Sequence, residues 1–60
     1  MAKVYAYKGW QFRQICRGNW EIVRMADGFH SYHNTPGGCQ AFVRLHGTAS
    51  NPDAAYQASL

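Results

Sequence analysis

Residues 15–38, ICRGNWEIVRMADGFHSYHNTPGG, decide the fold because they hold two turn signals and one helix-start signal. Gly18-Asn19 is a two-residue hairpin signal, since both residue types tolerate a positive φ. Asp27-Gly28 is a stronger signal of the same kind. The segments that flank both turns are rich in β-formers. The stretch therefore predicts successive antiparallel strands followed by a helix.

Three strands are expected around these turns, at residues 10–16 (WQFRQIC), 20–25 (WEIVRM) and 29–33 (FHSYH). Each combines aromatic or branched residues with turn residues at its ends. The residues before Gly9 include further β-formers, which suggest a short extended lead-in suited to an additional edge pairing. The sequence thus predicts a three-stranded meander.

A helix is expected over residues 36–46. Thr35 is a good N-cap, Pro36 suits the first helical position, and Gly47 is placed as a C-terminal stop. One face of this helix follows an i, i+3, i+4, i+7 spacing, formed by Cys39, Phe42, Val43 and His46. A helix this short should hold only by packing on the sheet.

The predicted architecture is α+β, a three-stranded antiparallel meander packed on one C-terminal helix in the order β-β-β-α. The chain has 60 residues, which limits it to one small domain, expected at residues 1–50. Residues 51–60 are small and polar and are expected to form a mobile tail. Asn51-Pro52-Asp53 within them is compatible with one turn of helix.

The first turn also predicts a register. Counting outward from Gly18-Asn19 pairs Arg17 with Trp20, Ile15 with Ile22, and Arg13 with Arg24. Side chains alternate along strands, so these six residues share one face. The opposite face carries Trp10, Phe12, Cys16, Val23 and Met25. This second set is more uniformly apolar, and we expect it to be the face that the helix covers.

The predicted open face then places Arg13 directly opposite Arg24. Like charges in this position cost stability, which makes sense if an anion or an acidic partner lies over the pair. In the alternative interpretation, the arginine stems shield Ile15 and Ile22 while their charged ends stay in water. A register shift of one residue would swap the faces and turn Ile15, Trp20 and Ile22 inward.

The order of elements, with "WEIVR" in the middle strand and "NTPGGCQAF" at the helix start, resembles two families. One is the N-terminal DNA-binding domain of some phage and transposon integrases, and the other is the plant ethylene-response-type DNA-binding domain. The resemblance covers residues 10–47 and is one of topology and composition. It implies a sheet laid in the major groove. The residues at the matching positions are Arg13, Arg17, Trp20 and Arg24.

The formal net charge is +3, with a pI near 9.2, a mild basic bias that is compatible with nucleic acid. The leading hypothesis is a small non-enzymatic binding module for nucleic acid, specifically DNA. The alternative is a protein-interaction module, such as an accessory or inhibitory protein of phage or bacterial origin. Homodimerisation fits both, because so small a domain gains core by pairing.

Catalysis and metal binding find little support. The carboxylates are Glu21, Asp27 and Asp53, and a chain this short has little room to build a pocket around a nucleophile. His30 and His33 lie three apart on a strand and point to opposite faces, which argues against zinc ligation with His46 and Cys39. We expect no enzyme activity and no cofactor.

The two cysteines bear on the compartment. The first ten residues lack the apolar run of a signal peptide, and no stretch reaches the ~20 apolar residues of a membrane span. A cytoplasmic location is therefore expected, with no membrane partner. There Cys16 and Cys39 should be reduced, buried thiols. A disulfide between them is the alternative under oxidising conditions.

Overall fold

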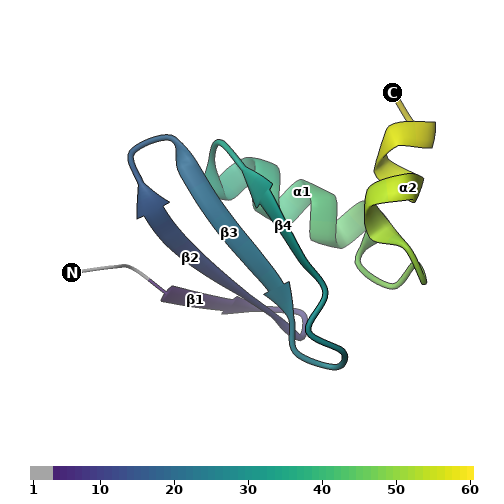
Figure 1. Ribbon diagram of the computed structural model, residues 1–60, viewed down its shortest axis with the longest axis horizontal. Coiled ribbons are helices and arrows are strands. Elements are labelled where there is room, and N and C mark those ends of the chain that lie inside the picture. The colour runs from purple at the N-terminus through teal and green to yellow at the C-terminus, as the bar shows by residue number, and fades with distance from the viewer. Residues whose placement is uncertain (1–3) are drawn as a thin grey trace.

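A computed structural model describes residues 4–60 as four strands followed by two helices (Figure 1). The elements are β1 (Val4–Tyr7), β2 (Trp10–Cys16), β3 (Asn19–Arg24), β4 (His30–His33), α1 (Pro36–His46) and α2 (Pro52–Ala58). The α+β class is confirmed, but the sheet has a fourth strand and the chain a second helix. The first three residues of the expected domain at 1–50 lie outside the described residues.

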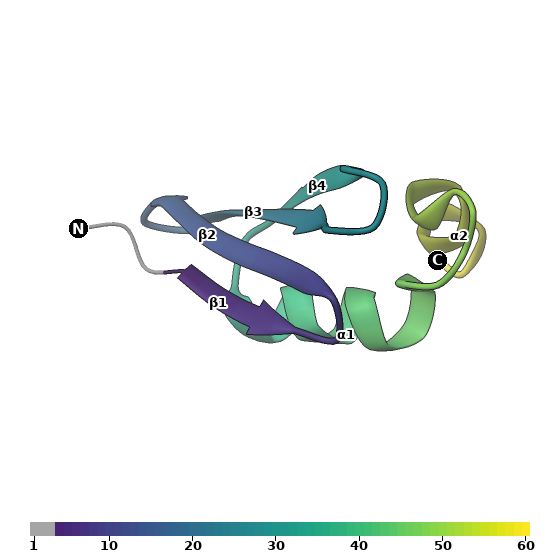
Figure 2. The same cartoon turned by 90° about the horizontal axis from the view of Figure 1, so that it is seen from below.

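The sheet is an antiparallel meander with the order β1-β2-β3-β4. Helix α1 lies under one face, and α2 packs at the end of the molecule beyond β4 (Figure 2). Among residues 4–60, no element covers the other face. The core between sheet and α1 consists of Trp10, Phe12, Trp20, Ile22, Cys39, Phe42 and Val43.

The lead-in forms β1, so the suggested edge pairing is present. A tight turn at Lys8-Gly9 joins it to β2, with φ of 49° and 81° at these residues. Two successive positive φ values are the mark of the turn whose twist matches a hairpin. Glycine takes this conformation freely, whereas Lys8 adopts it at a cost. β1 is therefore an edge strand held by a strict two-residue turn.

The predicted register of β2 against β3 is wrong. The turn lies at Arg17-Gly18, one residue earlier than expected, and pairs Cys16 with Asn19. The register then shifts between Gln14 and Cys16, which leaves Ile15 as an extra residue in β2. One extra residue turns the rest of a strand to its other face. β3 is therefore flipped relative to the prediction, while β2 is not.

The flip exchanges the two sides of β3. Trp20 and Ile22 enter the core, with Ile22 opposite Phe12. Met25, predicted to be buried, is 62% exposed, and Ile15 is 48% exposed. Two further members of the predicted core lie outside it: Val23, which is on the open face, and Cys16, which is an exposed thiol.

Helix α1 has the predicted bounds, because its end signals are local. The side chain of Thr35 accepts a hydrogen bond from the Gly38 N–H at 3.0 Å. Gly47 ends the helix without a left-handed conformation. A Cβ at this position would clash with the backbone carbonyl oxygen of Val43 and would lie 3.0 Å from Nε1 of Trp10. Glycine is thus needed here because the Val43 carbonyl and the indole of Trp10 leave no room for a side chain.

The expected tail instead forms α2 with an Asn51 N-cap, whose side chain accepts from the Ala54 N–H. Pro52 is buried. Tyr56 packs on the core, with its ring 5.6 Å from that of Phe42 and 6.1 Å from that of His33. These contacts attach the C-terminal segment to the domain.

Candidate interaction site

The four residues predicted to bind a partner are not gathered on one surface. Trp20 is 4% exposed, so its predicted place on the open face is wrong. It belongs to the core, and the ring of Tyr5 stacks on it at 5.7 Å between centroids. A buried indole contributes its apolar area to folding and has little left for a ligand.

Arg24 does not face Arg13, because the flip of β3 turns it to the helix side. Its Nη1 donates to the backbone oxygens of Gly47 and Ala49 at 3.0 and 2.8 Å. Nε and Nη2 together hold both carboxylate oxygens of Asp27, at 3.0 and 2.7 Å. The arginine thus ties the β3–β4 turn to the segment after α1.

The Arg24–Asp27 pair is reinforced on both sides. The guanidinium carbon lies 5.6 Å from the ring centroids of both Trp10 and Phe29. Hydrogen bonding from Arg24, followed by that from the Phe29 backbone N–H, lowers the pKa of Asp27 to about 2. The same carboxylate raises the pKa of Arg24. Both groups are therefore charged over the whole physiological range and engaged inside the molecule.

Arg13 does lie on the open face, but it is neutralised there. Its Nη2 is 2.8 Å from Oε1 of Glu21, the residue directly opposite. The Tyr32 hydroxyl donates to the other carboxylate oxygen of Glu21 at 3.2 Å. Arg17 is exposed at the β2–β3 turn. Of the four predicted residues, Arg13 and Arg17 are therefore the ones available to a partner.

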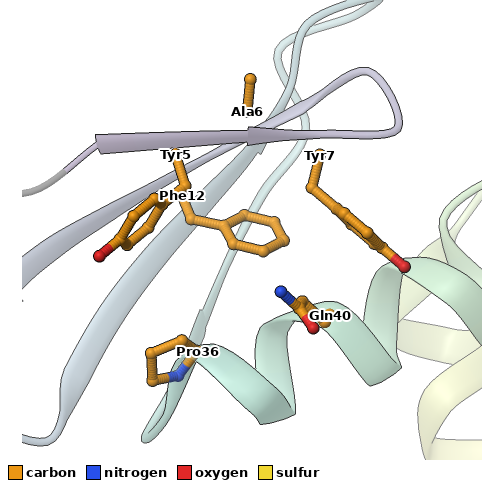
Figure 3. A pocket seen from close by; sticks show the side chains of 6 residues that line it. All are labelled: Tyr5, Ala6, Tyr7, Phe12, Pro36 and Gln40. Carbon is orange, nitrogen blue, oxygen red and sulfur yellow. The ribbon is translucent and has the colours of Figure 1, made fainter.

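A concave site lies elsewhere, between β1 and the first half of α1. This groove has a volume of about 240 Å³. It is lined by Tyr5, Ala6, Tyr7, Phe12, Pro36 and Gln40. Figure 3 shows both tyrosines extending from β1 toward α1, with Phe12 between them and Gln40 on the helix below. The lining is mostly apolar, with the tyrosine hydroxyls and the Gln40 amide as polar groups.

Among residues 4–60, no strand pairs with the outer side of β1, so this wall of the groove is also a free sheet edge. Tyr7 and Trp10 flank the two-residue turn, and residues in that position exchange both of their backbone hydrogen bonds. Such pairs alternate along an antiparallel ladder, so Tyr5 also directs its backbone groups toward β2. The N–H and C=O groups of Val4 and Ala6 consequently point away from the sheet.

This groove was not predicted from the sequence. The alternation of tyrosine and small or branched residues in "VYAY" was a usable signal, because it places Tyr5 and Tyr7 on one side of a strand. No local sequence pattern indicates the gap between β1 and α1. That gap depends on how far the helix extends beneath the sheet.

No group of three or more His, Cys, Asp and Glu side chains in residues 4–60 is placed to hold a metal ion. No helix within these residues has the length and apolar character needed to cross a membrane. Comparisons of the chain with protein-family models, curated proteins and solved structures found no significant match.

Proposed function

We propose that this protein is a small non-enzymatic protein-interaction module that binds an extended segment of a partner along β1. The observation that carries the proposal is the combination of a free strand edge with an apolar groove beside it. An added strand obtains affinity from backbone hydrogen bonds and specificity from side chains that enter a neighbouring pocket. In this protein the edge of β1 offers the backbone groups, and the groove beside it offers the pocket.

The geometry of such a complex follows from the register. The added strand bonds to the outward backbone groups of Val4 and Ala6. Its side chains alternate between the two faces of the widened sheet. Those on the helix side lie over Phe12 and between the two tyrosines that line the groove. Every second side chain of the bound segment therefore faces the groove, and the groove selects among these side chains.

A selection of linear peptides from a random library against the protein tests the proposal. Selected peptides should bind the wild type and Ala6→Val, which keeps the outward N–H. They should lose binding to Ala6→Pro, because proline removes that donor while sparing the bonds to β2. Circular dichroism of both variants serves as the folding control. Equal binding to all three proteins would refute strand addition.

The same edge also suits pairing with a second copy of the chain. Sedimentation of the wild type and of Ala6→Pro distinguishes this occupant. A concentration-dependent dimer that only the proline variant loses would make β1 a homodimer interface and would overturn the proposal of a foreign segment.

Nucleic acid remains a second candidate, on the open face of the sheet. It is favoured by two exposed arginines, Arg13 and Arg17, near the same end of β2 and by the edge-on pair of His30 and Tyr32. Aromatic rings on an uncovered sheet can stack on bases. The carboxylate of Glu21 in the middle of this face opposes phosphate binding, which is why the candidate ranks second.

This second candidate has its own test. Fluorescence anisotropy with duplex DNA and with single-stranded oligonucleotides at ~50 mM salt should show binding that weakens as salt rises. Arg17→Ala should flatten the salt slope by about one phosphate contact. Absence of salt-sensitive binding to both probes would eliminate nucleic acid as the ligand.

A further inference from the structure

We infer that the segment bound along β1 is acidic, with an apolar side chain that enters the groove. The inference rests on the proposed function and adds the chemistry of the partner to it. Among residues 4–60, acidic and basic side chains are distributed differently over the sheet, and only the basic ones lie near β1.

The acidic side chains of residues 4–60 all lie away from β1, and each is already engaged. Glu21, on β3, holds Arg13 and Tyr32. Asp27 belongs to the β3–β4 turn, where it is paired with Arg24. The third, Asp53, sits on α2 and accepts a hydrogen bond from Ser31 of β4. The negative charge is thus located in the middle and at the far edge of the sheet.

Two cations near the groove, Lys8 and Arg44, carry no such partner among residues 4–60. Lys8 follows directly after β1, and its Nζ lies 5.8 Å from the centroid of the Tyr7 ring, which lines the groove. Arg44 follows Gln40 by one helical turn, and residues four apart share a helix face. Within residues 4–60 the ion pairs are those of Arg13 and Arg24, so both cations are uncompensated.

The positive charges lie toward the end of β1 and the second half of α1, whereas the groove itself is apolar. A segment that follows the edge meets the rings first and the cations at the Tyr7 end. Acidic residues flanking an apolar one match this order. Opposite charge would also accelerate the encounter between the segment and the protein. This acceleration is larger at low salt, where the charges are screened less.

The same charges disfavour a second copy of the chain. Two molecules paired along β1 would leave Lys8 and Arg44 of each without a facing carboxylate, because the described acidic side chains lie away from this edge, and each chain carries a formal net charge of +3. Like net charge on two partners disfavours their association. An anionic segment is therefore a better complement for this edge than a copy of the protein itself.

The test uses two short blocked peptides with the same centre, Thr-Phe-Thr-Val-Thr, flanked in one by glutamates and in the other by lysines. Affinity for the intact protein is measured by calorimetry or fluorescence at low and at high salt. The glutamate peptide should bind at least tenfold more tightly at low salt, and high salt should remove most of that preference. Lys8→Glu and Arg44→Glu should each reduce the preference severalfold.

Arg17→Glu is the matched control, because it changes the net charge equally at an exposed turn away from the groove. It should leave the preference nearly unchanged. Equal affinity for the two peptides would overturn the acidic assignment and leave strand addition standing. An equal loss in Arg17→Glu would reduce the effect to general charge attraction and overturn it as well. If neither peptide binds, and library peptides also fail, the proposed function itself is wrong.

Discussion

At the scale of single residues, Arg24 illustrates how one side chain can close a small domain. It satisfies two backbone carbonyls after α1 and a carboxylate in the β3–β4 turn, with its plane near two aromatic rings. Only a planar fork with several fixed donors can make these contacts together. The residue that the sequence marked as a ligand contact therefore holds the fold.

Replacing Arg24 by lysine should lower the thermal midpoint by several degrees, although the charge is kept. Lysine cannot hold both oxygens of Asp27 and reach the carbonyls of Gly47 and Ala49 at the same time. Differential scanning calorimetry checks this. Arg17→Lys is the control and should leave the midpoint unchanged, since Arg17 is an exposed turn residue. An unchanged midpoint in Arg24→Lys would mean that the fork is not needed.

The pKa of Asp27 predicts a pH dependence of stability. Its folded value of about 2 lies below the ordinary 3.8. Between these values the unfolded chain binds more protons than the folded one, so stability rises with pH. The contribution is complete above pH 3.8 and is lost as the pH falls toward 2. Urea unfolding across this range should show it, and Asp27→Asn should be less stable at neutral pH and lose less on acidification.

At the scale of elements, α2 is the part of the fold that depends most on one contact. The helix has seven residues and is too short to be stable alone. Its Tyr56 ring lies within about 6 Å of the ring centroids of His33, Phe42 and His46. Burial lowers the pKa of His33 beside it, so the neutral imidazole is favoured in this cluster.

Removal of residues 51–60 should therefore cost more than ~2 kcal/mol of unfolding free energy, because each aromatic contact is worth roughly 0.5–1.5 kcal/mol and Phe42 becomes exposed. Tyr56→Ala in the full chain should reproduce most of the loss. Chemical denaturation measures both. If the truncated domain is as stable as the full chain, α2 contributes nothing and the segment behaves as the expected tail.

The elements also show what the sequence could predict. The ends of α1 were correct because Thr35, Pro36 and Gly47 act on their own neighbours. The faces of β3 were wrong because a bulge at Ile15 is selected by packing, where Ile22 opposite Phe12 fills the core better than Val23 does. No turn residue in the sequence indicates such a bulge.

The predictions for the candidate site also divide into those that depend on local signals and those that depend on the register. The exposure of Arg13 and Arg17 was predicted correctly from strand alternation and turn position. Trp20 and Arg24 depended on the register and changed sides with it. The groove was missed because it arises between two elements that lie far apart in the chain, β1 and α1. Local patterns cannot place such a surface.

At the scale of the whole molecule, stability rests on a single thin core. Ile22 is fully buried, whereas its neighbour Val23 lies on the open face. Ile22→Ala should cost about 2–5 kcal/mol, comparable to the ~3–5 kcal/mol that a domain of this size has in total. Val23→Ala should cost less than about 1 kcal/mol.

This adjacent pair tests the register directly. Ile22→Ala should be largely unfolded at 37 °C by circular dichroism, while Val23→Ala keeps a cooperative transition. The reverse order of the two variants would restore the register that the sequence suggested and would move Trp20 back to the surface.

The strand order β1-β2-β3-β4 has a kinetic consequence. Every strand pairs with its immediate neighbour in the chain across a short turn. Loop closures of this length take far less than a millisecond, and topologies built from such local pairings fold quickly. Each hairpin can thus form as soon as its residues leave the ribosome. Helix α1 is synthesised after the strands, so the aromatic rings of β1 and β2 stay exposed to solvent until it packs on them. The surface exposed in that interval includes the one that remains partly open as the groove in the folded domain.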